Sequence, residues 1–302
     1  IYEVFFLAKY ISKERFDLIH VSGGVWQVKG IIVAKILRIP VVWHINDTFM
    51  PKIIRLLFKW FSSLPDAYVF ASSKSKDYYG RYINANIPSY IIPATVDTSK
   101  FDPHTKIENK EKLKISKKKL TVGTVANISP VKGIDKIIEV ANYFKDNDDI
   151  EFIIIGQVPK TQSKYFNRLS KRIKTYNLKN IHFKNFKEDI RPFLRIIDIY
   201  LCTSYAESSP ISIWEAMSME KAIISNNVGD VPKYIQNNHN GILINKNETN
   251  EIINGLKFLI KNKEKRKSYG IKARETCKKN LETRIFADHQ LQVFEKLVIN
   301  KR

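Results

Sequence analysis

The sequence is poor in cysteine, with only Cys202 and Cys277 in 302 residues. Two distant thiols cannot form the disulfide framework of a small secreted module, and they supply no zinc or iron–sulfur framework. So few cysteines are typical of a protein kept in a reducing cytosol, and we expect a cytoplasmic location. The fold must then be held by hydrophobic cores, and the length predicts two of them, one in each of two domains.

Long apolar runs and an N-terminal signal segment are also missing. The most apolar stretch, residues 30–45, is interrupted by Lys35 and Arg38, whereas a membrane-spanning helix needs about 20 apolar residues in succession. Charged residues make up 27% of the chain and hydrophobic residues 44%, which argues against disorder. The sequence therefore predicts a folded protein that is soluble or peripheral to a membrane.

Acidic residues are scarce relative to basic ones, 30 against 51, and the formal net charge is +21. Such a charge suits nucleic acid, anionic lipid or a phosphorylated small molecule, or it reflects a lysine-rich composition on solvated surfaces. Lysine greatly outnumbers arginine, the residue that recognises bases and phosphates with two hydrogen bonds, so composition favours the last interpretation. With no recognisable nucleic-acid-binding motif, we expect no nucleic-acid partner, and such a function is the least favoured alternative.

Short runs of β-branched residues alternate with helical patterns along most of the chain. Residues 18–21, 40–43, 67–70 and 90–92 form one series of expected strands, and residues 120–125, 150–155, 181–183, 199–202, 222–225 and 241–244 form a second. The alternation predicts βαβ units and parallel sheets. A lysine-rich stretch, residues 106–119, separates the two series as a linker. The predicted fold class is α/β, with two Rossmann-like domains in tandem and a ligand cleft at the carboxyl ends of the strands.

Two polar loops in the second series carry the candidate chemistry. Residues 127–133 follow the first strand, with Lys132 just before a helix and Gly133 allowing close approach of the backbone. Residues 203–210 follow a later strand, and the amides near Ser209 and Ile211 form a helix N-terminus that suits an anion. Taken alone, each loop is equally consistent with an ordinary strand–loop–helix connection.

Two glutamates accompany the second loop. Glu207 lies on the loop and Glu215 lies eight positions later in the following helix, so both can border one pocket. A carboxylate accepts two hydrogen bonds and matches a pair of neighbouring hydroxyl groups. Anion-binding amides between two carboxylates therefore suit a diphosphate joined to hydroxyl-rich groups.

Together these features resemble family 4 glycosyltransferases, which have the GT-B fold. The shared residues are Lys132-Gly133, Glu207, Glu215-Ala216-Met217, Gly229-Asp230-Val231-Pro232 and Asn240-Gly241-Ile242-Leu243, with Pro40-Val41-Val42, His44, Ser72-Ser73 and Val96-Asp97 in the first half. The resemblance implies domains at 1–105 and 120–283, the linker at 106–119, and a C-terminal helix, 284–302, that returns to the first domain. The family's first strand and glycine-rich loop have no counterpart before Phe16, so we expect an incomplete N-terminal domain and weak or no activity from these residues alone.

The resemblance also assigns roles by position. Glu207 and His44 are the expected catalytic residues, which contact the transferred sugar. The expected nucleotide-sugar contacts are Asn127, where the family often has arginine, Lys132, Gly133, Ser209, Pro210, Ile211 and Glu215, with Glu215 on the ribose. The resemblance implies a retaining hexosyltransferase that uses a nucleotide-sugar, expected to be a UDP-hexose, without a separate cofactor. We expect it to act on a lipid-linked or cell-surface polysaccharide acceptor. A GT-B nucleotide-sugar epimerase is the alternative enzyme.

Two further segments have more than one interpretation. From Met50 to Phe61 an amphipathic helix carries Lys52, Arg55 and Lys59 on one side. It predicts either a core helix with a basic solvent face, which we favour, or a contact with an anionic membrane on the inner face of the cell membrane. Residues 146–149 carry three aspartates, but at a helix-to-strand turn these are ordinary residues, and we expect no metal site.

Overall fold

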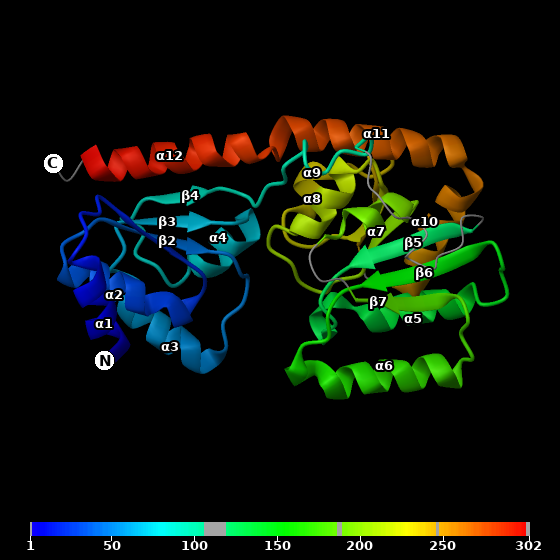
Figure 1. Ribbon diagram of the computed structural model, residues 1–302, viewed down its shortest axis with the longest axis horizontal. Coiled ribbons are helices and arrows are strands. Elements are labelled where there is room, and N and C mark those ends of the chain that lie inside the picture. The colour runs from blue at the N-terminus through cyan, green and yellow to red at the C-terminus, as the bar shows by residue number, and fades with distance from the viewer. Residues whose placement is uncertain (1, 106–118, 186–188, 246–247, 300–302) are drawn as a thin grey trace. The chain divides into compact units, whose positions relative to one another are not determined.

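The computed structural model describes residues 2–105, 119–185, 189–245 and 248–299 (Figure 1). The chain divides into two compact units. Unit 1 is drawn from Ile1–Ala94, Glu207–Ser209 and Thr283–Arg302, and unit 2 from Thr95–Ala206 and Pro210–Glu282. Of the predicted linker, residues 106–119, all but Lys119 lies outside the described residues. The predicted segment 284–302 contains most of a helix that belongs to unit 1.

Unit 1 contains one parallel sheet with helices on both faces. Its elements are α1 (Tyr2–Ile11), β1 (Ile19–Ser22), η1 (Val25–Gln27), α2 (Val28–Ile36), β2 (Val41–Ile45), α3 (Lys52–Phe61), β3 (Ala67–Phe70), α4 (Ser73–Tyr79), β4 (Ser89–Ile91) and α12 (Thr283–Ile299). The four strands lie in the order β1-β2-β3-β4. This is the arrangement that the βαβ pattern predicts.

The two faces of this sheet are covered by different parts of the chain. Because side chains alternate along a strand, Trp43 and Ile45 of β2 face one side, where they pack with Ile31 of α2 and Phe58 of α3. Val42 faces the other side and packs with Val293 of α12. Figure 1 shows α12 (red) along the latter side of the sheet. The C-terminal helix thus completes the core of unit 1.

Unit 2 has a larger parallel sheet. Its elements are β5 (Leu120–Val125), η3 (Pro130–Lys132), α5 (Ile134–Tyr143), β6 (Ile150–Ile155), η4 (Lys160–Gln162), α6 (Ser163–Thr175), β7 (Ile181–Lys184), α7 (Arg191–Ile196), β8 (Ile199–Cys202), α8 (Ile211–Ser218), β9 (Ala222–Asn226), α9 (Val231–Tyr234), β10 (Ile242–Ile244), α10 (Thr249–Lys261) and α11 (Lys263–Asn280). Among the described residues the strand order is β10-β9-β8-β5-β6-β7. Both faces are buried: Phe152 and Ile154 pack in the core with α5, and Ile153 and Ile155 pack in the core with α8.

The fold class predicted from sequence is confirmed, because each unit is an α/β layer structure around a parallel sheet. Every strand expected from the two series of β-branched runs is present. The residues Ile134, Ile137, Ile138 and Ala141 of α5, spaced at i, i+3, i+4 and i+7, are buried against the sheet of unit 2. In the part of the chain that the structure describes, no helix combines the length and apolar character needed to cross a membrane.

Candidate functional site

The strand order of unit 2 reverses at one point, between β5 and β8. From β5 the chain continues outward to β6 and β7, and from β8 it continues in the opposite direction to β9 and β10. Ligands of open α/β sheets bind outside the carboxyl ends of the strands at such a switch point. The loops 127–133 and 203–210 follow β5 and β8. Both predicted ligand loops therefore begin at the switch point of the unit 2 sheet.

Hydrogen bonds lock the two loops together. The Thr203 hydroxyl lies 2.9 Å from the Gly133 carbonyl and 3.2 Å from the Lys132 carbonyl, and these two acceptors share its single hydrogen. The Tyr205 amide donates to the Val131 carbonyl at 2.8 Å. Sequence reasoning missed Thr203, although a hydroxyl residue directly after a buried strand is a usable signal. The 127–133 loop is therefore held in place by the start of the 203–210 loop.

Gly133 is required by this close approach. Its φ is +62°, in the left-handed region, and a Cβ at this position would lie 2.1 Å from the Thr203 carbonyl oxygen. A side chain can be accommodated only if one of the two loops moves. The glycine thus permits the contact between the β5 and β8 loops.

Replacing Gly133 with alanine is expected to destabilise unit 2 by about 2–4 kcal/mol, from the left-handed backbone and the displaced loop. Urea denaturation followed by circular dichroism measures the loss. Gly255→Ala is the matched control, because Gly255 lies inside α10 and its Cβ would make only ordinary contacts of 3.5–3.6 Å. Equal stability of the two variants would contradict this role for Gly133.

The structure places the other predicted residues of the β5 loop as follows. Asn127 is exposed, and the next residue, Ile128, is anchored because its amide donates to the Gln157 carbonyl at 2.9 Å. Lys132 is half-buried and ends η3. Asn127, Lys132 and Gly133 therefore share one anchored loop at the switch point, and their contacts with a ligand remain predictions.

Helix α8 begins at the carboxyl end of β8. Pro210 precedes it, and its carbonyl accepts the amides of Ile213 and Trp214 at 3.0 and 3.3 Å. The first amides of a helix have no acceptor within the helix, and here Ile211 and Ser212 hold those positions. Pro210 has no N–H of its own, so its part in anion binding is limited to shaping this helix start.

Glu215 lies one turn into α8. Burial raises the pKa of its carboxyl group to about 7, and the charge of Lys100 lowers it by less than burial raises it. At neutral pH the carboxyl is thus close to half protonated. A desolvated carboxylate near a switch point is well suited to accept hydrogen bonds from ligand hydroxyl groups.

The segment Glu207–Ser209 belongs to unit 1. The hydroxyls of Ser208 and Ser72 lie 2.9 Å apart, and the Ala94 amide donates to the Ser209 hydroxyl at 3.0 Å. Ser72 follows β3, so these contacts hold the segment at the carboxyl end of the unit 1 sheet. Glu207 is half-buried on this segment, and its contact with a sugar remains a prediction.

His44, the other residue expected to contact the sugar, is buried in unit 1. It lies inside β2 with 6% of its surface exposed, and its ring stacks on His20 at 5.4 Å and on Phe286 of α12 at 6.3 Å between centroids. Burial, and to a lesser extent His20, lower the pKa of His44 to about 4, so the ring is neutral. The ring is enclosed because His44 shares the face of Val42, which α12 covers. The structure thus places His44 in the core of unit 1, and its contact with a sugar remains a prediction.

Asn46 and Asp47 stand at the end of β2 instead, and sequence reasoning missed both. The Asn46 side-chain amide donates to the Ser22 hydroxyl at 2.9 Å, and the Tyr79 hydroxyl donates to the Asp47 carboxylate. Burial of its carboxylate raises the pKa of Asp47, while the bond from Tyr79 opposes this. A polar pair directly after a buried strand was the available signal.

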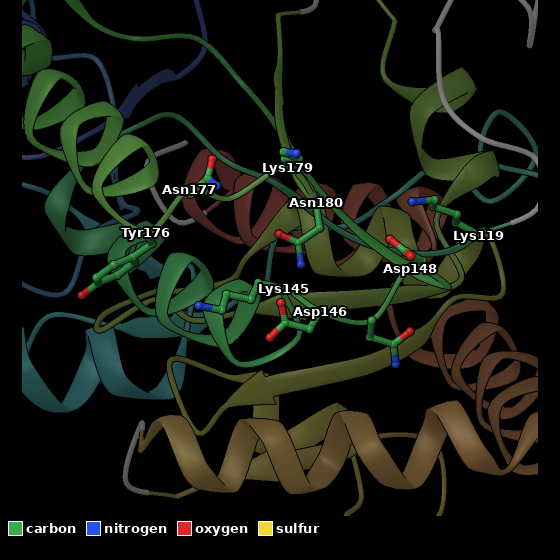
Figure 2. Close-up of a pocket in the computed structure, with 9 residues that line it drawn as sticks. Lys119, Lys145, Asp146, Asp148, Tyr176, Asn177, Lys179 and Asn180 are labelled. Carbon is green, nitrogen blue, oxygen red and sulfur yellow. The ribbon is translucent and has the colours of Figure 1, made fainter.

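A pocket of about 410 Å³ opens at the amino ends of β5, β6 and β7, away from the switch point. Its lining is polar and comprises Lys119, Lys145, Asp146, Asn147, Asp148, Tyr176, Asn177, Lys179 and Asn180. Figure 2 shows the three lysine ammonium groups at separate sides of the hollow. Across the described residues, no three His, Cys, Asp or Glu side chains gather as metal ligands would.

Comparisons with known proteins follow the same division of the chain. Residues 105–276 match the family described as Glycosyl transferases group 1, and residues 1–100 match Glycosyltransferase Family 4. An Escherichia coli enzyme, UDP-Gal:alpha-D-GlcNAc-diphosphoundecaprenol alpha-1,3-galactosyltransferase, is 26% identical over 83% of this chain and 68% of its own. A Campylobacter jejuni enzyme, N,N'-diacetylbacillosaminyl-diphospho-undecaprenol alpha-1,3-N-acetylgalactosaminyltransferase, is 22% identical over 98% and 81%.

The fold has solved counterparts. The Anabaena protein HepE, in complex with UDP and glucose, superposes with a TM-score of 0.89 at 19% identity, over 97% of this chain and 81% of that one. At this identity the likeness concerns the fold. The group 1 match covers more than half of the chain and coincides with the unit that holds the switch-point loops. The chain therefore belongs to the glycosyl transferases group 1, the GT-B glycosyltransferases of family 4, and is a glycosyltransferase.

Proposed function

We propose that the protein is a retaining glycosyltransferase that transfers a hexose from a UDP-hexose to a lipid-linked or polysaccharide acceptor. The observation that carries the donor proposal is the pair of loops at the switch point of unit 2, joined through Thr203. After two neighbouring strands, β5 and β8, these loops and helix α8 supply a lysine, a helix N-terminus and a desolvated glutamate. A nucleoside diphosphate offers the matching phosphates and ribose hydroxyl groups.

Each group then has a role. The Lys132 ammonium and the amides that begin α8 stabilise the diphosphate, and Asn127 contributes a neutral hydrogen bond to it. Glu215 accepts hydrogen bonds from the ribose, and Glu207 contacts the transferred sugar.

In the transfer, the bond between the anomeric carbon and the diphosphate breaks, and its electron pair stays on the phosphate. The acceptor oxygen bonds to the same face of the sugar and gives its proton to the leaving phosphate. Fixed cations and helix ends stabilise the departing charge, so no separate cofactor is needed.

The acceptor proposal is supported by the relatives. The names of the Escherichia coli and Campylobacter jejuni enzymes specify diphosphoundecaprenol-linked acceptors and alpha linkages. A Staphylococcus aureus relative, 27% identical over 57% of this chain, is a poly(ribitol-phosphate) alpha-N-acetylglucosaminyltransferase. Since a lipid-linked acceptor is anchored in a bilayer, we propose that the protein works at the inner face of the cell membrane.

Calorimetric titration with UDP, UDP-glucose, UDP-galactose and GDP-mannose tests the donor. We expect the UDP compounds to bind, and Glu215→Ala to weaken their binding about 10- to 100-fold, because a charged hydrogen-bond acceptor is lost. Glu275→Ala, which removes an exposed carboxylate from α11 of the same unit, is the control and should bind as the wild type does.

Unchanged affinity in Glu215→Ala would contradict the contact between Glu215 and the ribose. Preference for GDP-mannose would contradict the proposal that the donor nucleotide is UDP.

Incubation with a UDP-hexose and a diphosphoundecaprenol-linked sugar, with chelator present, tests transfer. Proton coupling at the new anomeric centre reports the linkage. An inverted linkage would contradict retention, and loss of activity with chelator would contradict a reaction without metal.

A further inference from the structure

Helix α3 of unit 1 exposes apolar side chains that its packing does not require. Ile53, Leu56 and Trp60 are 75%, 64% and 78% exposed. The inward side of the same helix is supplied by Ile54 and Phe58, which are buried in the core of unit 1. A helix on a globular domain normally has one apolar stripe, which faces inward. This helix has a second apolar stripe that faces outward.

A basic stripe runs beside the outward apolar stripe. At 100° per residue, the side chains of Lys52, Arg55 and Lys59 fall in one sector, and those of Ile53, Leu56 and Trp60 fall in the next. The Arg55 guanidinium donates to the Tyr82 hydroxyl at 3.3 Å, and Lys59 lies over the Tyr82 ring at 6.0 Å from its centroid. The sequence of α3, KIIRLLFKWF, has no acidic residue. The exposed side of α3 is therefore half cationic and half apolar.

Two exposed aromatic residues lie on segments next to α3. Phe49, which precedes α3, is 69% exposed, and Trp26 is 72% exposed on η1, an element in contact with α3. The sequence has four tryptophans. Trp43 and Trp214 are fully buried, so the two exposed tryptophans both belong to this region. An exposed apolar patch of this kind marks a contact surface.

The chemistry of the patch selects its partner. Tryptophan and phenylalanine beside leucine and isoleucine suit the boundary between headgroups and acyl chains, and adjacent lysine and arginine suit anionic headgroups. A core helix with a basic solvent face, the interpretation favoured from sequence, accounts for Ile54 and Phe58 but not for the outward stripe. We propose that α3, together with Phe49 and Trp26, docks unit 1 on an anionic lipid surface.

In this arrangement the apolar stripe enters the interface and the basic stripe meets the headgroups. The biological purpose of the contact rests on the proposed function, because a lipid-linked acceptor is presented at a membrane. The contact itself depends only on the exposed face of α3. It can therefore be measured without donor or acceptor, and its failure is distinguishable from failure of the transfer reaction.

The test uses the full chain and vesicles of two compositions, phosphatidylcholine alone and phosphatidylcholine with 30% phosphatidylglycerol. We expect co-sedimentation with the anionic vesicles and a blue shift of tryptophan emission. The shift reports on Trp26 and Trp60, since the other two tryptophans are already buried. Raising the salt should weaken binding, because surface attraction is screened.

Two sets of variants separate local docking from the general positive charge. Lys52→Glu, Arg55→Glu and Lys59→Glu together should weaken partitioning about 100-fold or more, since each basic residue near an anionic surface contributes roughly fivefold. The matched control reverses Lys164, Lys171 and Lys174, exposed residues of α6 in unit 2, and should lose far less.

Ile53→Ser, Leu56→Ser and Trp60→Ser together should weaken partitioning at least about 30-fold. The control is Ile36→Ser with Leu291→Ser, two exposed apolar residues of unit 1 outside this patch, and it should retain binding. UDP affinity should be unchanged in every variant, and an unchanged circular dichroism spectrum and urea transition should show that both units remain folded.

Three outcomes would overturn the proposal. Equal losses in the α3 and α6 charge variants would mean that net charge alone attracts the protein to vesicles. Sedimentation without an emission shift would mean that the apolar stripe does not enter the interface. Absence of binding to both vesicle compositions, with UDP binding intact, would mean that α3 does not dock on lipid.

Discussion

Replacing Arg274 with alanine is expected to destabilise unit 2 by about 3–5 kcal/mol, the usual loss when one partner of a buried charged cluster is removed. Arg274 of α11 is 7% exposed. Its guanidinium donates to the carbonyls of Phe101 and Thr98 at 3.0 and 3.4 Å, and to that of Ser218 at the end of α8. It also pairs with Asp102 at 3.3 Å. Alanine would remove all these bonds, and the Phe101 carbonyl would keep only the Ser218 hydroxyl as a donor, at 2.7 Å.

Urea denaturation followed by circular dichroism measures this loss, with Lys267→Ala as control. Lys267 is exposed on the same helix, and its removal should change stability by less than about 0.5 kcal/mol. Arg274→Lys should lie between the two, because an ammonium keeps the charge but cannot reproduce the planar fork of donors. Equal stability of Arg274→Ala and the control would show that solvent replaces these bonds.

The same cluster positions the candidate site. Arg274 joins α11 to the end of α8, and α8 carries Glu215 one turn from its beginning. The sequence shows Arg274 only as one of many cations on a basic helix. Its importance arises from contacts with residues 98–102 and 218, which lie far away along the chain, so no local pattern identifies it.

Strands were predictable because most of them are buried on both faces and form continuous β-branched runs, as β6 does. The order of the strands was not predictable in the same way. Whether β5 lies beside β8 depends on packing between segments about 75 residues apart. The loops could thus be proposed separately from sequence, but the bond from Thr203 that joins them could not.

His44 and α3 show a second limit. Alternation along β2 places His44 on the same face as Val42, but it does not reveal that α12, from the other end of the chain, covers that face. The pattern of α3 likewise predicts an amphipathic helix without showing which apolar residues point inward. Ile54 and Phe58 take that side because they fit the core beside Trp43 and Tyr79. In both cases the missing information is the identity of the covering element.

Binding of UDP-glucose at pH 7 is expected to release about half a proton per molecule bound. Burial raises the pKa of free Glu215 to about 7, so the carboxyl is about half protonated before binding. Hydrogen bonds from ribose hydroxyls favour the ionised carboxylate and lower its pKa in the complex. Affinity should therefore rise between pH 6 and pH 8. UDP-glucose suits the measurement because its doubly esterified diphosphate does not titrate near neutral pH.

Calorimetry in phosphate and in Tris measures the release, since the two buffers differ in heat of ionisation. Glu215→Gln should bind more weakly and release no proton from this site.

The effect of pH on the stability of the unliganded protein is opposite to its effect on affinity. A carboxyl whose folded pKa lies above its unfolded pKa destabilises the fold progressively as pH rises from about 4.5 through 7. Glu215→Gln should therefore melt above the wild type at pH 8 and close to it at pH 4. An enthalpy independent of buffer would contradict contact between Glu215 and the ribose, whereas equal melting temperatures at pH 8 would contradict its desolvation.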